Sequence, residues 1–470
     1  MSALEQFAGR RVLFLNWRDL SNPAAGGAEA YTEQIAQRFA RAGAMLTLFT
    51  SKYRGAPPYD CANRYNVVRQ GRRFGVYLAA ARHLRRYGHH YDAIVDFQNG
   101  IPFFAPFWVR TDAAVVCVVH HVHQAQFGMY FPWPVSSVGR LLEGRVSRRV
   151  YHGHPVIAVS PSTRAEIHSQ LGFRGPIHIV PNGIDPLPSS SVPRSATPTI
   201  AVVTRLVPHK QLHLLVEAVP DLLGRWPDLH VDIAGTGPAR DALLAQVRRL
   251  GVEHAVSFPG RVSDQAKRDL LSRAWLTVAP SLAEGWGLTV LEANAMGTPA
   301  VAYDVPGLRD SVRDQVTGWL APPGSPLAGP LTNALNELTD QDRQRTMAEQ
   351  SKAWADRFSW DASAERLAGV LLSEVMRSTL GGPSRRQAVH LATVASWPPD
   401  DTGAVGEFLR KALRVTDVIT SSENGLSVLM TGCDEVGAAK ALQRVPIPPS
   451  GLRLASTTEI LCGTGADDLP

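Results

Sequence analysis

Short apolar runs alternate with helical periodicity through the first 185 residues. Val12–Asn16 predicts a buried strand, the loop Trp17–Gly27 follows, and Glu29–Ala42 has the spacing of an amphipathic helix. Strand, glycine-containing loop, helix and strand together form the unit of a parallel sheet. We expect the remaining strands of this first series at Met45–Thr50, Ala93–Phe97, Ala114–Val119, Pro155–Ser160 and Ile177–Pro181.

The segment Pro186–Thr199, rich in Pro, Ser and Thr, interrupts this pattern and predicts a linker. A second alternating series follows, with strands expected at Thr199–Val203, His230–Ala234, Val256–Phe258, Leu276–Ala279 and Pro299–Ala302. Two successive α/β series of similar size predict two doubly wound parallel-sheet domains that face a cleft. A third, shorter stretch follows the Gly381–Ser384 break.

Composition restricts the class of protein further. The 470 residues include 44% hydrophobic side chains, which excludes a largely disordered chain. With 48 Lys and Arg against 42 Asp and Glu, the net charge of +6 is a mild excess that suits an anionic ligand or surface. The four cysteines are scattered, no apolar run spans a membrane and the first residues contain no apolar signal core, so we expect a cytoplasmic protein.

The first loop ends in Gly26 and Gly27, immediately before a helix. Adjacent glycines at a helix N-terminus let backbone N–H groups approach a phosphate or a sugar. A tight strand-to-helix turn explains the same pattern equally well.

The second series carries a pair of cations, Arg205 and Lys210, directly after its first strand. The carboxyl end of such a strand is the usual ligand edge of a doubly wound sheet, and Arg with Lys suits a diphosphate. A solvated pair of charges is the alternative interpretation.

A glutamate pair, Glu284 and Glu292, brackets two glycines and the start of a predicted helix. The free N–H groups of this helix N-terminus can hold phosphate, and they belong to Leu288, Thr289 and Val290. Glu292 can accept hydrogen bonds from a diol such as ribose, and Glu284 can reach another part of the same ligand. Two exposed glutamates without a role are the alternative.

In combination and in order, these motifs resemble the retaining glycosyltransferases of family four over residues 10–376. The resemblance also includes a histidine after the Ala114–Val119 strand, PNGID at 181–185, Gly235-x-Gly237 and FSWD at 358–361. It implies the α/β GT-B architecture of two facing Rossmann-like domains plus a small α+β module. The implied domains are an acceptor-side domain at 1–190 with a return helix at about 361–376, a nucleotide-sugar domain at 196–360 and the appended module at 385–470.

The resemblance also implies roles for individual residues. Arg205 and Lys210 would stabilise the departing diphosphate without a metal, Glu284 would contact the transferred sugar and His120 would lie at the reacting centre. Donor binding would involve Gly26, Gly27, Gly235, Gly237, Leu288, Thr289, Val290 and Glu292. The reaction would retain the anomeric configuration by same-face attack, so catalysis would rest on positioning and electrostatics.

Three positions depart from the family pattern or leave it ambiguous. Gln211 stands where the family often has glycine, and Trp286 replaces the more usual phenylalanine. The histidine segment contains His121 and His123 beside His120, and alternate residues of a strand share a face, so a metal pair is conceivable.

The stretch from Cys61 to Tyr91, which we call the basic segment, contains seven arginines and no acidic residue. Its apolar side chains are interleaved with the charges, which suits docking on anionic lipid, whereas a solvated basic helix explains it as well. The arginines assigned to this surface are Arg72, Arg73, Arg82, Arg85 and Arg86, and Arg64 and Arg69 belong to the same segment.

The tail predicts a helix at Ala404–Leu413, strands at Asp417–Thr420 and Leu426–Thr431 joined by a turn at Ser421–Gly425, and a helix at Glu435–Leu442. This order resembles the core of diguanylate cyclase domains. The catalytic turn of those domains is replaced here, so we expect a degenerate regulatory or interaction module.

The sequence therefore predicts a cytoplasmic hexosyltransferase, peripheral on the inner membrane face, that uses a nucleotide-diphosphate sugar, a lipid-linked or glycan acceptor, and neither cofactor nor metal nor nucleic acid. A catalytically silent GT-B regulator is the alternative. A dinucleotide oxidoreductase is suggested only by Gly235 and Gly237 after a strand and lacks the rest of its fingerprint.

Overall fold

The computed structural model describes residues 2–62, 64–110, 113–185, 192–379, 392–399, 405–406, 408–409, 418–422, 425–431, 435–445 and 447–455. The chain forms two compact units, the first from residues 1–111 and 115–366 and the second from 112–114 and 367–470. Part of the predicted linker, the Gly381–Ser384 break and most of the predicted helix Ala404–Leu413 lie outside the described residues.

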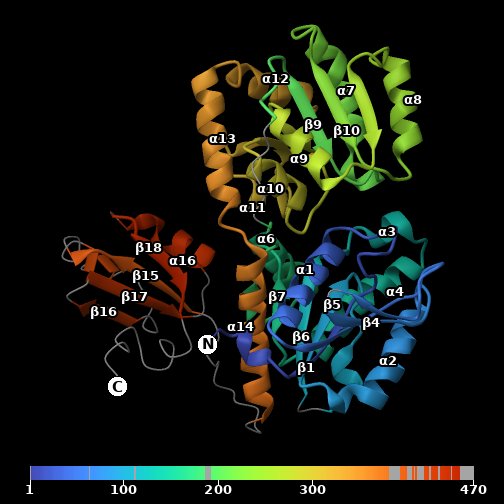
Figure 1. Ribbon diagram of the computed structural model, residues 1–470, viewed down its shortest axis with the longest axis vertical. Coiled ribbons are helices and arrows are strands. Elements are labelled where there is room, and N and C mark those ends of the chain that lie inside the picture. The colour runs from blue at the N-terminus through green and yellow to red at the C-terminus, as the bar shows by residue number, and fades with distance from the viewer. Residues whose placement is uncertain are drawn as a thin grey trace. The chain divides into compact units, whose positions relative to one another are not determined.

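The amino-terminal half of the first unit is built on one eight-stranded sheet, coloured blue to green in Figure 1. The pairs with printed register are parallel apart from the β3–β4 pair. The sheet order is β3 (Tyr59–Ala62), β4 (Tyr65–Arg69), β2 (Met45–Thr50), β1 (Arg11–Leu15), β5 (Ala93–Asn99), β6 (Ala114–His121), β7 (Val156–Ala158) and β8 (Ile177–Ile179).

Helices flank this sheet (Figure 1), namely α1 (Gly27–Arg41), α2 (Gly75–Tyr87), α3 (Phe127–Tyr130), α4 (Val135–Leu141), α5 (Ser147–Val150) and α6 (Pro161–Glu166). The central strand β1 is fully buried over Val12–Leu15 because both of its faces are covered. Phe14 packs edge-on against Phe39 of α1 and Phe97 of β5, with ring centroids 5.6 and 5.2 Å away.

The second half of this unit contains the other predicted parallel series. Its strands are β9 (Thr199–Val203), β10 (His230–Ala234), β11 (Val256–Gly260), β12 (Thr277–Ala279), β13 (Ala300–Tyr303) and β14 (Gly318–Ala321). They form two three-stranded sheets, and a bridge between Ile200 and Leu276 links β9 to the segment that leads into β12.

The helices of this half are α7 (Leu212–Leu223), α8 (Arg240–Leu250), α9 (Asp264–Arg273), α10 (Leu288–Ala295), α11 (Leu308–Ser311), α12 (Ala328–Glu337) and α13 (Gln341–Ala355), followed by α14 (Trp360–Thr379). The predicted strands therefore lie within a few residues of the observed ones. Strand β14 was not predicted, because its sequence Gly-Trp-Leu-Ala is short and contains no repeat of alternating polarity.

The basic segment contains structure that the sequence did not predict, the antiparallel hairpin of β3 and β4. Arg69 of β4 is only 2% exposed and forms ion pairs with Asp19 and Asp60. The expectation that this arginine belongs to a solvated or lipid-facing surface is therefore wrong. Its carboxylate partner Asp19 is fifty positions away, so no local pattern could reveal the pair.

The chain crosses between the two halves of the first unit twice, and the two crossing segments pack tightly. Ile184 and Ser359 form a parallel bridge, and a Cβ atom on Gly183 would lie 2.2 Å from the backbone nitrogen of Trp360. Arg38 of α1 pairs with Asp185 of the first crossing at 2.8 Å and with Asp361 of the second at 2.5 Å. One buried arginine thus fixes both crossings.

The second unit contains a four-stranded antiparallel sheet in the order β16 (Val418–Ser422), β17 (Gly425–Thr431), β15 (Ala392–Trp397) and β18 (Gly451–Leu454), with α16 (Glu435–Ala441). Its core includes Trp397, Val428 and Met430. The hairpin β16–β17 and the helix α16 match the prediction, whereas β15 and β18 were not predicted. The likeness to a degenerate cyclase module stays a prediction.

Replacing Gly183 by alanine tests the tight crossing. Because the new methyl group would meet backbone rather than a movable side chain, we expect a loss of about 2 kcal/mol in the free energy of unfolding. Chemical denaturation should show this loss, with Gly175→Ala as the control, since a Cβ atom at Gly175 meets nothing within 4 Å. Equal stability of the two variants would contradict the close packing.

Candidate functional site

The loop that carries Arg205 and Lys210 follows β9 and is held by backbone hydrogen bonds to the loop after β10. The Thr204 N–H donates to the Ala234 carbonyl at 3.0 Å, and the Leu206 N–H donates to the Thr236 carbonyl at 2.9 Å. A Cβ atom on Gly235 would lie 1.8 Å from the Thr204 carbonyl oxygen, and one on Gly237 would lie 2.2 Å from that of Leu206. In the structure these two glycines therefore allow the two loops to meet.

Lys210 and Glu284 form an ion pair at the site, and the Ser281 hydroxyl donates to the same Glu284 oxygen at 2.7 Å. The two charged side chains are only 13% and 18% exposed. Burial would raise the pKa of Glu284, but the adjacent Lys210 ammonium and the hydrogen bonds from Lys210 and Ser281 hold that pKa below its ordinary value. Glu284 is therefore an ionised, fixed carboxylate at neutral pH.

A pocket opens beside this ion pair at the carboxyl ends of β9 and β12. Its lining includes Thr204, Lys210, Ser281, Thr289 and Val290. The latter two belong to the first turn of α10, so the structure brings together the predicted cation and the predicted helix N-terminus. The Val290 N–H donates to the Gly287 carbonyl at 2.9 Å, so this group is not free as the sequence predicted. The N–H groups of Leu288 and Thr289 and the positive end of the helix dipole would favour an anionic group.

Leu288 and Glu292 also belong to α10 but have other partners. Leu288 packs against the apolar cluster that contains Trp286, which occupies the position of the family's usual phenylalanine. The Glu292 carboxylate accepts a hydrogen bond from the Lys267 ammonium of α9 at 2.8 Å. Burial lowers the pKa of Lys267, and Glu292 more than offsets this, so that the pKa is raised overall.

The glycine pair lies at the start of α1, where Gly26 is the N-cap. The Gly26 N–H donates to the Glu29 carboxylate at 2.7 Å, and a Cβ atom on Gly26 would lie 3.0 Å from the Arg205 guanidinium carbon. A Cβ atom on Gly27 would meet nothing within 4 Å. A side chain at Gly26 would therefore require the Arg205 guanidinium to shift by a few tenths of an ångström.

His120, near the end of β6, is buried between aromatic rings. It stacks on Phe97 and meets Tyr31 edge-on, with ring centroids 5.9 and 5.0 Å away, and its Nε2 atom has no hydrogen-bond partner. Burial, with the charge of His123, lowers the pKa of His120 to about 3, so the ring is neutral at neutral pH. A Cβ atom on Gly285 would lie 2.2 Å from the His120 carbonyl oxygen. The loop that contains Gly285 can therefore come this close to His120 only because position 285 is a glycine.

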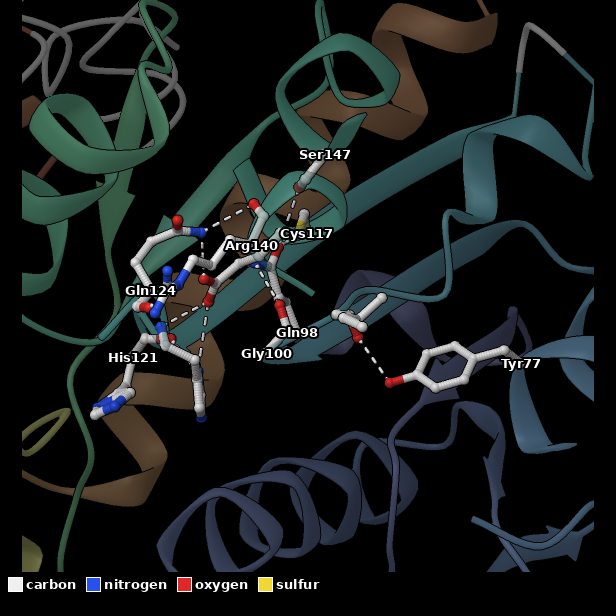
Figure 2. Close-up of polar contacts among 11 residues, drawn as sticks. Tyr77, Gln98, Gly100, Cys117, His121, Gln124, Arg140 and Ser147 are labelled. Atoms are coloured by element: carbon white, nitrogen blue, oxygen red, sulfur yellow. Dashed lines mark hydrogen bonds and ion pairs between the residues drawn. The ribbon is translucent and has the colours of Figure 1, made fainter. Parts of the chain in front are cut away.

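The segment after β6 is fixed from behind by a buried carboxylate, Glu143, which lies in a π-helical turn at Leu142–Val146. It accepts hydrogen bonds from the His123 backbone N–H at 2.6 Å and from the Gln124 side-chain amide at 2.7 Å. Figure 2 shows the surroundings of this network, in which Gln124, Arg140 and His121 lie near one another.

The two neighbouring histidines of this segment lie close to the site. The His123 Nδ1 atom is 2.9 Å from the His121 carbonyl, and the Nε2 atom of His121 is buried without a partner. Burial, followed by the charges of His123, His209 and Lys210 among others, lowers the pKa of His121 well below its ordinary value. Among the residues described, no group of three or more His, Cys, Asp or Glu side chains is arranged to hold a metal ion, so the conceived metal pair lacks further ligands.

Gln211 adopts the left-handed backbone conformation, with φ of +51°. Glycine adopts this conformation without cost from a Cβ atom, which agrees with the glycine that the family resemblance leads us to expect here. Gln211 adopts it at the cost of local strain.

Sequence reasoning missed several residues that surround the site, namely Arg18, Glu143, Thr204, Lys267 and Ser281. Ser281 could have been found from its position three residues before Glu284, because that spacing allows a local hydrogen bond. Thr204 and Arg18 lie in loops that the sequence had already singled out, beside Arg205 and before Gly26, whereas Glu143 and Lys267 come from separate elements for which the sequence gives no signal.

The Lys210–Glu284 ion pair predicts a pH-dependent effect of Lys210→Met. In the natural protein the pKa of Glu284 is lower in the folded state than in the unfolded state. The ion pair therefore stabilises the fold at pH values above the ordinary carboxyl pKa. This stabilisation is lost as the pH falls through the lowered pKa of the folded state. In the variant the unpaired buried carboxylate should cost about 3 kcal/mol at pH 7 and less at pH 4, where protonation removes its charge.

Urea denaturation at the two pH values measures this difference. The double variant Lys210→Met, Glu284→Gln is the control, because it contains no unpaired carboxylate at this position and should therefore be more stable than the single variant at pH 7. A deficit of the single variant that is the same at pH 7 and pH 4 would contradict the assignment of an ionised Glu284.

Two family models match the chain in succession. The model described as Glycosyltransferase Family 4 matches residues 25–186, and the model described as Glycosyl transferases group 1 matches residues 185–357. Together they span both halves of the first unit, including the glycine pair, His120, Arg205, Lys210 and the α10 segment.

Individual proteins extend this likeness. The chain is 28% identical over 376 residues to the GDP-mannose-dependent alpha-(1-6)-phosphatidylinositol monomannoside mannosyltransferase of Mycolicibacterium smegmatis, which covers 74% of this chain and 95% of that protein. Over a shorter stretch, 36% of this chain and 39% of the relative, it is 36% identical to the D-inositol 3-phosphate glycosyltransferase of Nocardia farcinica.

In three dimensions, the fold is similar to that of sucrose-phosphate synthase from Thermosynechococcus elongatus, with a TM-score of 0.63 at 19% identity, over 79% of this chain and 99% of that one. This confirms the predicted GT-B architecture of Rossmann-like parallel sheets. The chain belongs to the family-4 glycosyltransferases and is a GT-B hexosyltransferase that uses a nucleotide sugar.

Proposed function

We propose that this enzyme transfers a hexosyl unit from a nucleotide-diphosphate sugar to a lipid-linked or glycan acceptor, with retention of the anomeric configuration. The observation that carries the proposal is the meeting of Lys210, paired with Glu284, and the α10 N-terminus at one pocket, with Arg205 in the same loop as Lys210. This arrangement suits a diphosphate attached to a sugar, because it combines cations and N–H groups with a carboxylate that accepts hydroxyl hydrogen bonds.

The donor would lie with its diphosphate between Arg205 and the α10 N-terminus. Lys210 lines the pocket and would hold the departing phosphate, while Glu284, fixed by Lys210 and Ser281, would accept hydrogen bonds from the transferred sugar. Glu292 would bind the ribose while one of its carboxylate oxygens also accepts a hydrogen bond from Lys267. Gly235 and Gly237 would support this site by allowing the Arg205 loop to pack, rather than by contacting the donor.

The proposed chemistry is electrostatic. As the glycosidic bond to the phosphate breaks, negative charge grows on the phosphate oxygens, and fixed cations stabilise it without rearrangement. Arg205 and Lys210 would supply the charge that a metal supplies in other enzymes. His120 is neutral and its carbonyl borders the Gly285 loop, so it would offer a hydrogen-bonding contact to the donor sugar rather than a proton.

The acceptor class is inferred from the relatives. The mannosyltransferase relative acts, by its name, on a phosphatidylinositol monomannoside, and the shorter match acts on D-inositol 3-phosphate. Mannosyl transfer to a phosphate-bearing inositol lipid or a related glycan is therefore the first donor and acceptor combination to test.

A membrane-facing surface on the amino-terminal half would suit a lipid acceptor. In α2, Leu78, Arg82 and Arg85 are exposed and share a face, and Phe74 precedes it with half of its surface exposed. Exposed Arg72, Arg73 and Arg86 add charge at the two ends of this helix. Within the described parts of the chain, no helix is long and apolar enough to cross a membrane.

A catalytically silent regulator with the same fold is the second candidate. The fixed Glu284 carboxylate disfavours this candidate. A regulator that only binds a nucleotide does not need a carboxylate for sugar hydroxyls beside its phosphate site. Turnover of a nucleotide sugar separates the two functions.

Replacing residues of the donor site should separate binding from turnover. We expect Lys210→Ala or Glu292→Ala to weaken nucleoside diphosphate binding by roughly tenfold or more, through loss of charge-assisted hydrogen bonds. Arg205→Ala should mainly slow turnover. Calorimetric titration with GDP and UDP, and release of nucleoside diphosphate from nucleotide sugars, measure the two effects, with the exposed Lys52→Ala as control. Unchanged affinity across the site variants would contradict the assignment.

Lipid docking predicts that the chain floats with vesicles containing anionic phospholipid. Substituting glutamine for Arg72, Arg73, Arg85 and Arg86 should abolish most flotation, because each basic residue near such a surface contributes about 1 kcal/mol. A variant that removes the same charge elsewhere, at the exposed Arg225, Arg248, Arg249 and Arg261, should still float. Equal behaviour of the two variants would rule out a specific docking surface.

A further inference from the structure

Two arginines from opposite halves of the first unit meet at the glycine loop. Arg18, in the loop after β1, donates from its Nη1 to the Ala24 carbonyl at 2.6 Å. Arg205, from the loop after β9, donates from its Nη1 to the same carbonyl at 3.5 Å. One backbone oxygen therefore serves two guanidinium groups, which leaves most of their N–H donors unused.

Neither arginine is neutralised by a carboxylate among the described residues. No ion pair involves Arg18 or Arg205 there, and the nearby Glu29 carboxylate instead accepts the Gly26 backbone N–H at 2.7 Å. Burial lowers the pKa of Arg18, Glu29 raises it, and the positive charge of Arg205 lowers it again. Arg205 is exposed, so water screens part of the repulsion between the two like charges, and an anion between them would remove more of it.

Arg18 is also held in place before any ligand arrives. Its guanidinium lies over the Trp17 ring, 4.3 Å from the ring centroid, and its hydrogen bond to Ala24 fixes its direction. A guanidinium fixed in this way presents a planar fork of donors that fits the oxygens of a phosphate. Gly26 passes beside the Arg205 guanidinium, and the backbone N–H groups of the α1 N-terminus lie next to it.

We propose that Arg18 is a phosphate-binding residue of this enzyme and acts with Arg205 as a pair that the two halves of the fold assemble. The inference rests on the proposed function only for the identity of the ligand. Charge balance supports it. A nucleotide-sugar diphosphate carries about two negative charges, and Glu284 offsets part of the Lys210 charge, so Arg18 would add to the charge that Arg205 and Lys210 supply.

The phosphate that Arg18 binds has two sources, the donor diphosphate or a phosphate group on the acceptor. A donor phosphate would bring the amino-terminal half into nucleotide binding, and an acceptor phosphate would make Arg18 a determinant of acceptor choice. The same chemistry serves both, and they differ in whether the site is occupied once nucleoside diphosphate is bound.

Calorimetry on the full chain distinguishes these sources with Arg18→Gln. If Arg18 binds the donor, the affinity for GDP or UDP should fall by roughly tenfold, and Arg18→Lys should recover part of it. If Arg18 binds the acceptor, the variant should keep its nucleotide affinity, while inorganic phosphate should bind the nucleotide-saturated natural protein and not the variant. Arg54→Gln, an exposed arginine of the same half, is the matched control.

Unchanged binding of both nucleoside diphosphate and inorganic phosphate in Arg18→Gln would overturn the inference. Failure of the proposed function looks different, since the natural protein would then bind no nucleoside diphosphate at all. In that case a loss of inorganic phosphate binding by Arg18→Gln would still support the arginine pair. Thermal unfolding of each variant shows whether a loss of binding reflects a loss of folding.

Discussion

The packing of the two crossing segments is the constraint on which the site depends. The segment with Gly183 and the segment with Trp360 run side by side with no room for a Cβ atom, and Arg38 pairs with an aspartate from each. Because residues of the site come from both halves, their meeting requires these crossings to be fixed. His120 and Gly26 belong to one half, and Gly285 and Arg205 to the other, yet their backbone or side-chain atoms approach within contact distance.

Electrostatics divides the charged residues of the site into two groups. Lys210 with Glu284, and Lys267 with Glu292, are neutralised pairs that fix the direction of each carboxylate. Arg18 and Arg205 have no such partner among the described residues and share one carbonyl. Fixed carboxylates suit sugar hydroxyls and unneutralised cations suit phosphates, so the proposed site would combine the two kinds of recognition that a nucleotide sugar requires.

Much of the fold followed from local pattern. Strands such as β1, β2 and β9 are apolar runs bounded by glycine or polar residues, and their position is readable because strands buried on both faces must be continuously apolar. The hairpin of β3 and β4 was hidden, since buried Arg69 depends on Asp19 and Asp60 and looks like a surface charge in the sequence. The short edge strands β14 and β18 were also missed, because they contain little repeating pattern, and so was β15, which lies between β17 and β18.

The sequence by itself determined the α/β class, the family and the residue types of the candidate donor site, because glycines before helices and charges after strands are local signals. Only the tertiary structure decided the partners, such as Lys267 for Glu292, Glu143 for His123 and Arg18 beside Arg205. These contacts join residues that are far apart along the chain. Their geometry depends on how separate strands and helices pack, and no spacing within one segment encodes it.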